Sequence, residues 1–160
     1  MSKHIVTKAD IEHMDGLAKS HFLNPDAQRV NKSLGDLTGI TGFGFHIIEV
    51  PPGRSPSECH AHRFEDECIY VLSGTADAVI GADTHRVGAG DFIGYPAGGE
   101  AHMITNVGDD TLTCIVVGER RAHDVADYPR LQKRLYRNGS EPWNLVDMAD
   151  IETPQAGKKA

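Results

Sequence analysis

Cysteine is scarce in this sequence of 160 residues. The three cysteines are an odd number and lack the Cys-x-x-Cys spacing of zinc cages and redox motifs: Cys59, Cys68 and Cys114. A disulfide framework or a zinc site built on thiolates is therefore not expected. Cys68 and Cys114 are predicted to be small buried hydrophobic residues. For Cys59, contact with a substrate or oxidant stays open as an alternative, although no base is placed to activate its thiol.

An excess of positive charge and a long apolar run are also missing. The formal net charge is -7, whereas nucleic acids and anionic membrane surfaces both attract a basic face. No apolar stretch approaches the roughly 20 residues of a membrane-spanning helix. Residues 1–7 lack the apolar run of a secretory signal peptide. We therefore expect no nucleic-acid partner, no membrane partner and a soluble cytoplasmic protein.

The chain does have enough apolar material for one core. Hydrophobic residues make up 39% of it, and a chain of this length buries about 70% of its unfolded surface. We expect a single domain over residues 1–160. Its parts are predicted to be a core at about 40–118, an N-terminal segment at 1–39 and a C-terminal arm at 119–160.

Short apolar runs separated by turn residues predict an all-β fold. The expected strands are separated by clusters of glycine, proline and aspartate, which favour a sandwich or barrel; they cover residues 43–50, 75–80, 84–87, 92–95, 103–106 and 111–117. Because side chains alternate along a strand, His46, Ile48 and Val50 are predicted to share one face of the first strand. The last two strands are predicted to form a hairpin.

The two ends of the chain give weaker patterns. Thr7-x-x-Asp10 is typical of a capped helix start, and apolar residues then recur at helical spacing: Ile11, Met14, Leu17 and Ala18. These features predict a short helix within residues 7–21, outside the barrel. Beyond Gly118 the composition becomes polar, and residues 130–137 combine four positive charges with a few apolar side chains. We expect this arm to pack on the barrel or on a second subunit.

One stretch concentrates the residue types that bind metals. His60 and His62 are two residues apart, so they can point the same way from one strand. Glu67 begins the next apolar run, and His102 follows a Gly/Pro turn further along the chain. If these side chains converge, they make a transition-metal site. The alternative is four unrelated polar residues on a β surface.

Residues 53–74 and 90–106 resemble the paired signature motifs of the cupin superfamily. Several spacings match the family pattern: Glu67 to Gly74, Gly90 to Pro96 to Gly98, and His102 to Asn106. One extra residue precedes His60 and another precedes His102, both in predicted loops that tolerate insertion. The resemblance implies a double-stranded β-helix, the cupin jelly-roll barrel. It further implies a homodimer and a metal bound by His60, His62, Glu67 and His102.

Three imidazoles and one carboxylate, without a thiolate, favour a divalent transition metal such as Zn, Mn, Fe or Ni over calcium. The sequence does not choose among these metals. Four protein ligands would leave one or two coordination positions open, as catalytic sites require.

Three further residues are candidates for the substrate pocket: His46, Tyr95 and Arg54. Their alternatives are a satisfied core histidine, a barrel-core aromatic and a solvated loop charge, respectively. Glu65 and Asp66 flank Glu67 and are expected to be exposed loop carboxylates, with orientation of the metal histidines as the alternative.

The segments Leu34–Gly39, Val117–Arg121 and Asp127–Pro129 add a resemblance to small bacterial single-domain cupins, some of which are described as possible sugar-phosphate isomerases. Our first hypothesis is a metal-dependent enzyme acting on a small polar metabolite. Its reaction would be isomerisation of a sugar phosphate, or oxygenase or lyase chemistry on a hydroxy or keto acid. The alternative is a non-catalytic ligand-binding or sensor protein, because one fold hosts many functions. No catalytic residue is assigned.

Overall fold

Short antiparallel strands dominate the computed structural model, which describes residues 4–157. The largest sheet has the order β1-β2-β3-β10-β5-β8. Its strands are Leu17–His21 (β1), Asn24–Ser33 (β2), Phe43–Val50 (β3), Leu112–Glu119 (β10), Glu67–Ser73 (β5) and Phe92–Tyr95 (β8). The helical segments are Lys8–Glu12 (α1), Leu34–Thr38 (α2) and two 3-10 turns, Pro129–Leu131 and Met148–Asp150.

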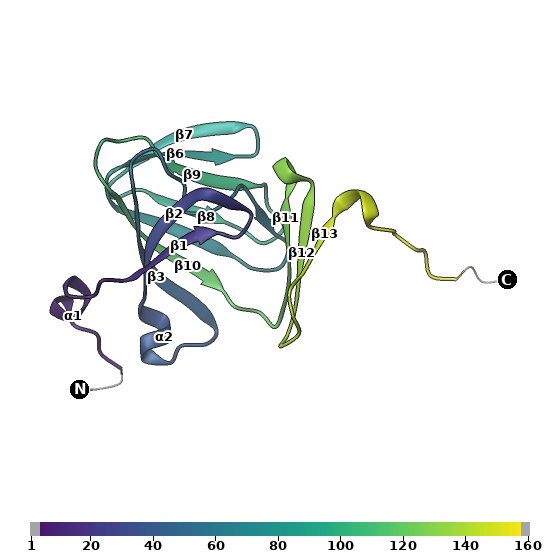
Figure 1. Cartoon of the computed structure of the whole chain (residues 1–160), viewed down its shortest axis with the longest axis horizontal. Helices are drawn as coiled ribbons and strands as arrows, with labels where there is room; N and C mark the ends of the chain where they lie inside the picture. The colour runs from purple at the N-terminus through teal and green to yellow at the C-terminus, as the bar shows by residue number, and fades with distance from the viewer. Residues whose placement is uncertain (1–3, 158–160) are drawn as a thin grey trace.

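Two smaller sheets face or flank this one. One has the order β7-β6-β9, with strands Asp83–Gly88 (β7), Thr75–Ile80 (β6) and His102–Asn106 (β9). The other has the order β13-β12-β11-β4, with strands Asn144–Asp147 (β13), Lys133–Asn138 (β12), His123–Tyr128 (β11) and Ala61–His62 (β4). A bridge between His60 and His102 connects them. The predicted all-β jelly-roll barrel is confirmed (Figure 1).

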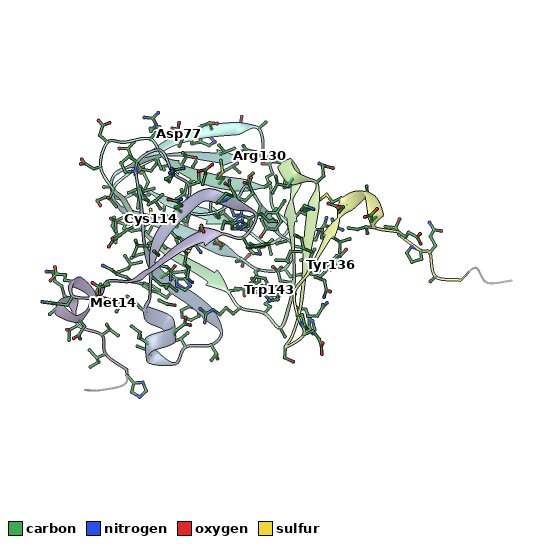
Figure 2. All side chains as sticks on the ribbon, in the orientation of Figure 1. Met14, Asp77, Cys114, Arg130, Tyr136 and Trp143 are labelled. Atoms are coloured by element: carbon green, nitrogen blue, oxygen red, sulfur yellow. The ribbon has the colours of Figure 1, made fainter. Side chains whose placement is uncertain are left out.

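The core lies between the large sheet and the β7-β6-β9 sheet. Buried apolar side chains from both form one cluster: Ile48, Val50, Ile69, Val71, Ala76, Ala78, Ile93, Tyr95, Ile104, Leu112 and Cys114. Each buried valine, isoleucine or leucine contributes about 1.5–3 kcal/mol. Figure 2 shows Cys114 within the barrel, which agrees with its prediction as a small core residue. Cys68 is only partly buried.

Gly74 explains one glycine of the motif. It has a φ of 90° at the turn between β5 and β6, and a Cβ there would lie 2.8 Å from the Leu112 Cα. A side chain would therefore strain the backbone and collide with β10. Asn106 secures the neighbouring turn, because its Nδ2 donates to the carbonyl oxygens of Val50 and Asp110 at 2.8 and 2.9 Å.

Strand β3 spans the predicted residues and turns His46, Ile48 and Val50 toward the interior. The predicted hairpin of residues 103–106 and 111–117 is wrong. Strand β9 pairs with β6, whereas β10 pairs with β3 and β5, so the turn between them crosses from one sheet to the other. Alternation identifies a strand and its faces, but it does not identify the partner strand.

The predicted N-terminal helix is present but shorter than the periodicity indicated. Thr7 caps α1 reciprocally with Asp10, as expected, and the helix ends at Glu12. Gly16 then takes a φ of 74°, and the chain continues as β1, paired with β2. Leu17 and Ala18 therefore belong to a strand, which is a correction. Backbone pairing with β2 outweighs a helical pattern that a left-handed glycine interrupts.

The C-terminal arm packs on the barrel through backbone pairing. Ala126 and Asp127 of β11 pair with His62 and Ala61 of β4. Figure 1 shows β11, β12 and β13 at one end of the barrel, with residues 152–157 extending away. A second, smaller apolar cluster forms there: Ala126, Tyr128 and Leu135, with Leu23 packed against them. Within residues 4–157, no helix has the length and apolar character needed to cross a membrane.

Candidate metal centre and cavity

His60 and His62 are held by hydrogen bonds at the same ring atom. The Nδ1 of His60 lies 2.7 Å from the carbonyl oxygen of Glu58, and the Nδ1 of His62 lies 2.7 Å from an oxygen of Asp124. Both partners are acceptors, so each Nδ1 carries the proton. The Nε2 of each ring is left with a lone pair, the form in which histidine binds a metal.

His102 arrives beside His60 through the backbone. The two residues exchange hydrogen bonds, His60 N to His102 O at 3.1 Å and His102 N to His60 O at 2.8 Å. The Nδ1 of His102 lies 3.2 Å from the carbonyl oxygen of Glu100. Its Nε2 is buried and has no hydrogen-bond partner among the described residues. Burial lowers the pKa of His102 to about 3, so the ring is neutral and offers a lone pair.

Glu67 comes from the opposite sheet. Its carboxylate and the ring nitrogens of His60 and His62 lie within 4.8 Å of one another. His102 is outside this group, but its Nε2 is 3.9 Å from the Glu67 Oε1. His102 therefore lies beside the group of three, and its orphaned nitrogen is the kind of buried polar atom that a metal satisfies. This set of nitrogen and oxygen donors fits a divalent transition metal.

The Asp124 carboxylate changes the electrostatics of one histidine. Burial acts to lower the pKa of His62, but the hydrogen bond to Asp124 and the nearby carboxylates outweigh it, so this pKa is raised. For His60, burial is the largest effect, and its pKa is lowered. Burial raises the pKa of Asp124, but its bond to His62 and the nearby Arg137 produce a net lowering. Asp124 is thus a carboxylate that orients His62.

A buried network extends from His62 into the C-terminal sheet. Glu65 and Asp124 are 4% and 1% exposed, and the Nη2 of Arg137 pairs with both carboxylates. The Arg121 amide also donates to Glu65 at 2.7 Å. The expectation that Glu65 is an exposed loop carboxylate is therefore wrong, because β12 supplies a cation that the local sequence does not show. Asp66 is exposed as expected.

The side chains of His60, His62, His102 and Glu67 line a cavity of about 730 Å³. The β1–β2 hairpin contributes one wall through Lys19, His21 and Arg29, and the C-terminal sheet contributes Tyr128. Trp143, which precedes β13, also lines the cavity and lies between the barrel and the C-terminal strands (Figure 2). The β1–β2 hairpin and the C-terminal sheet therefore both contribute walls to the cavity.

Tyr95 lines this cavity beside His102. Its ring stacks on His102 with centroids 3.6 Å apart and planes 4° apart, and it pairs across the strands with Glu67. The phenol oxygen is buried without a hydrogen-bond partner among residues 4–157. Burial, followed by the charge of Glu67, raises the pKa of Tyr95, so the phenol keeps its proton. Tyr95 is thus both part of the core and part of the cavity lining.

His46 also lines the cavity, and its Nδ1 is 3.2 Å from the Asn31 Nδ2. Its ring fills space that Gly44 leaves free, since a Cβ on Gly44 would lie 2.6 Å from the His46 Nε2. Burial lowers the pKa of His46. Arg54, in contrast, is not among the residues that line the cavity; its Nη1 is 2.7 Å from Asp26. The geometry gives the predicted substrate role of Arg54 no support.

The Cupin domain family matches residues 46–118. The crystal structure of a "putative sugar phosphate isomerase" from Acidithiobacillus ferrooxidans superposes with a TM-score of 0.93 and 48% identity, covering 96% of this chain and 98% of that one. The chain belongs to the cupin superfamily. Comparison with curated proteins found no match.

Two other cupins support the fold alone. A sugar phosphate isomerase of the cupin superfamily from Silicibacter pomeroyi has a TM-score of 0.78 and 24% identity, covering 91% of this chain and 95% of that one. A Cupin 2 conserved barrel domain protein from Salinispora arenicola has a TM-score of 0.51 and 23% identity, covering 59% and 77%. The first similarity covers most of this cupin, whereas the second covers less of it.

Sequence reasoning missed two residues of the centre of this cupin, Asp124 and Arg137. Each is about 60 residues or more from His62 in the chain, and neither lies within the residues matched by the family. The only signal was the alternation of Asp124, Ala126 and Tyr128, which places an acidic residue on the buried face of a strand.

Proposed function

We propose that this cupin is a metal-dependent isomerase of a sugar phosphate or a similar small polar metabolite. The observation that carries the proposal is the position of three imidazoles and a carboxylate at the wall of a cavity of about 730 Å³. Pockets of this volume take small molecules. The similarity of nearly the whole chain to the "putative sugar phosphate isomerase" of Acidithiobacillus ferrooxidans supports the choice of substrate.

His60, His62, Glu67 and His102 would hold one divalent transition metal, with Zn, Mn, Fe and Ni as the candidates. When bound, the metal supplies a Lewis acid that polarises a substrate oxygen. The chain prepares the three imidazoles by fixing each Nδ1 to an acceptor, which leaves each Nε2 free. Such outer partners orient the ring and fix its tautomer before binding.

Three side chains would act on the substrate directly. Tyr95 keeps its proton, and its phenol has no hydrogen-bond partner among residues 4–157, so it would donate a hydrogen bond to a substrate oxygen. Glu67 makes no hydrogen bond within the described residues, so its carboxylate can hold the proton that isomerisation moves between neighbouring carbons whenever it is released from the metal. His46 lines the same cavity and contacts the substrate.

The test begins with protein purified without a metal-affinity step. Elemental analysis identifies the metal, and NMR follows the exchange of aldose and ketose phosphates before and after chelation. We expect activity that chelation abolishes and the same metal restores. Tyr95→Phe should keep the metal and lower turnover by roughly 10²–10³-fold, as for the loss of one hydrogen-bond donor to a developing charge. Full activity after chelation would refute the proposal, and oxygen uptake with bound iron would indicate a dioxygenase instead.

One observation favours a non-catalytic ligand-binding protein as the second candidate. The cavity carboxylates other than Glu67 are engaged: Glu65 with Arg137, Asp66 with the Ala97 amide, and Glu119 with Arg121. If Glu67 is committed to the metal, no free carboxylate remains to move a proton. This candidate predicts that a sugar phosphate raises the melting temperature without forming product over long incubation.

We also propose that the protein is a homodimer. Neighbouring strands at one edge of the large sheet carry exposed apolar side chains on their outer face: Tyr70 and Leu72 at 42% and Phe92 at 66%. Pairing of these faces would remove them from water. Analytical ultracentrifugation should give a dimer that Phe92→Glu converts to a monomer, and a monomeric unaltered protein would contradict the proposal.

A further inference from the structure

The arginines that line the cavity differ in their partners. Arg120 pairs with Asp36 at 2.5 Å, and Arg137 pairs with Glu65 and Asp124. Arg29, on β2, makes no ion pair within residues 4–157; its Nη1 donates to the carbonyl oxygen of Pro56. A guanidinium has five N–H donors, so most donors of Arg29 have no partner within the described residues.

A second cation lies directly opposite Arg29. In the antiparallel β1–β2 pair, Lys19 is the cross-strand partner of Arg29, and both side chains line the cavity. Like charges at directly opposite positions destabilise a sheet. Lys19 also makes no ion pair within the described residues. Neither cation has an ion-pair partner in the described part of the chain, so the hairpin presents two adjacent positive charges to the cavity.

The position of Arg29 is close to the candidate metal centre. Its charge acts on His60, His46 and His21, and it interacts with the carboxylate of Glu67. Burial lowers the pKa of the Arg29 guanidinium, which reflects its poor solvation. A poorly solvated charge is costly unless an opposite charge compensates it. Glu67 compensates the charge of Arg29 only in part. A metal bound to Glu67 would compete with Arg29 for the same negative charge.

We propose that Arg29 and Lys19 form an anion-binding subsite that holds the phosphate or carboxylate end of the ligand. The planar fork of Arg29 matches the oxygens of either group, and Lys19 adds a point charge. The opposite end of the ligand then carries the hydroxyl or carbonyl oxygens that reach the histidines. This last step depends on the proposed function, whereas anion binding by the hairpin does not.

The substrate class narrows accordingly to small molecules with an anionic group at one end and oxygen donors at the other. A neutral sugar would leave Arg29 without a counter-charge. Arg54 has no such part in this subsite, because it lies outside the cavity and Asp26 already neutralises it. Arg54 therefore serves as the matched control for Arg29.

Phosphorus NMR titration of metal-loaded protein with inorganic phosphate tests the subsite directly. We expect Arg29→Gln to weaken phosphate binding roughly tenfold to a hundredfold, because a hydrogen bond to a charged group is lost. Lys19→Gln should weaken it by roughly two- to fivefold, as for an exposed charge. Arg54→Gln should leave it unchanged. Metal content, measured by elemental analysis, should be the same in all variants.

Equal phosphate affinity in Arg29→Gln and Arg54→Gln would overturn the proposal. Phosphate binding that disappears on chelation but survives Arg29→Gln would also overturn it, because the phosphate would then bind the metal. If Arg29→Gln does not fold, Lys19→Gln serves as the test of the subsite. An unchanged phosphate affinity in Lys19→Gln would then overturn the proposal. A parallel titration with acetate shows whether the subsite prefers a carboxylate or a phosphate. If neither anion binds, the proposed subsite is refuted.

The phosphate titration tests the subsite independently of catalytic turnover. If phosphate binding depends on Arg29 but no aldose or ketose phosphate reacts, the subsite stands and the isomerase proposal fails. If isomerisation occurs with the same KM in Arg29→Gln and in the unaltered protein, the isomerase proposal stands and the subsite fails.

Discussion

The wall of the cavity that carries the histidines differs from the walls contributed by the two ends of the chain. Residues 58–67 and 95–106 supply the nitrogen and oxygen donors, and their spacing is readable from short motifs. The β1–β2 hairpin and the C-terminal sheet supply charges that act on those donors or face the cavity from a distance in sequence. The first wall supplies the candidate metal ligands, whereas the other walls orient those ligands and determine which small molecules fit the cavity.

The two regions also differ in how they are packed. The barrel holds the large apolar cluster around Leu112, which is fully buried, whereas the C-terminal sheet holds only the small cluster around Leu135. Buried charges take the place of apolar side chains beside His62. We therefore expect the barrel to contribute most of the free energy of unfolding. We expect the C-terminal sheet to orient the histidines of the metal centre.

Loss of a histidine from the motif wall should have the largest effect. We expect His60→Ala to weaken metal affinity by more than about 100-fold, because loss of an outer partner alone typically costs 10–100-fold. Isothermal titration with the native metal measures this loss. His85→Ala, at an exposed position on β7, is the matched control and should bind normally. Normal metal affinity in His60→Ala would remove the proposed centre.

The packing difference predicts unequal costs of truncation. Leu112→Ala should destabilise the protein by about 3–5 kcal/mol, near the top of the range for buried leucines, because its site cannot collapse. Leu135→Ala should cost about 2 kcal/mol, since fewer buried neighbours surround it. Urea unfolding of metal-free protein measures both values. Equal costs would show that the C-terminal sheet is as much part of the core as the barrel.

The coupling between the two regions is tested at Asp124. Asp124→Asn should reduce metal affinity by about 10–100-fold, because the amide no longer fixes the ring and charge of His62. Asp127→Asn is the matched control on the same strand, where the carboxylate pairs with Arg63 and Arg134 instead. Titration with the metal compares the two. Similar affinities in both variants would mean that the C-terminal sheet does not adjust the metal centre.

A smaller effect is expected from pH at the N-terminal wall. Burial, then the charges of His60 and Arg29, lowers the pKa of His21 to about 4 from 6.5. The unfolded state thus binds the proton first, so stability from neutral His21 is present above pH 6.5 and lost as the pH falls toward 4. Because solvent reaches the ring, the slope should be below the ~1.4 kcal/mol per pH unit of a fully linked proton.

His21 also accepts a hydrogen bond from the Leu23 amide at 3.2 Å, which requires the unprotonated Nδ1. Unfolding curves of the unaltered protein and His21→Gln between pH 7 and pH 4 isolate this contribution. The unaltered protein should lose more stability than the variant as the pH falls. Parallel curves would show that His21 is not protected in the folded state.

Most of the barrel could be predicted from the sequence. Strand β3 and its inward face follow from alternation, and the turns at Gly74 and Asn106 follow from residues with particular backbone or hydrogen-bonding needs. Strand partners could not be predicted, as the separation of β9 and β10 into different sheets shows. The helical spacing that continues past Gly16 to Leu17 and Ala18 was likewise overridden by pairing with β2.

The sequence by itself determined the all-β class of the barrel through local periodicity, and the resemblance of residues 53–74 and 90–106 to the cupin motifs indicated the candidate metal ligands. Only the tertiary structure decided that Asp124 fixes His62, that Arg137 neutralises Glu65, and that Arg29 rather than Arg54 faces the cavity. Those relations join residues that are far apart in the chain. Burial and electrostatic pairing between them arise only once the sheets have closed around a common space.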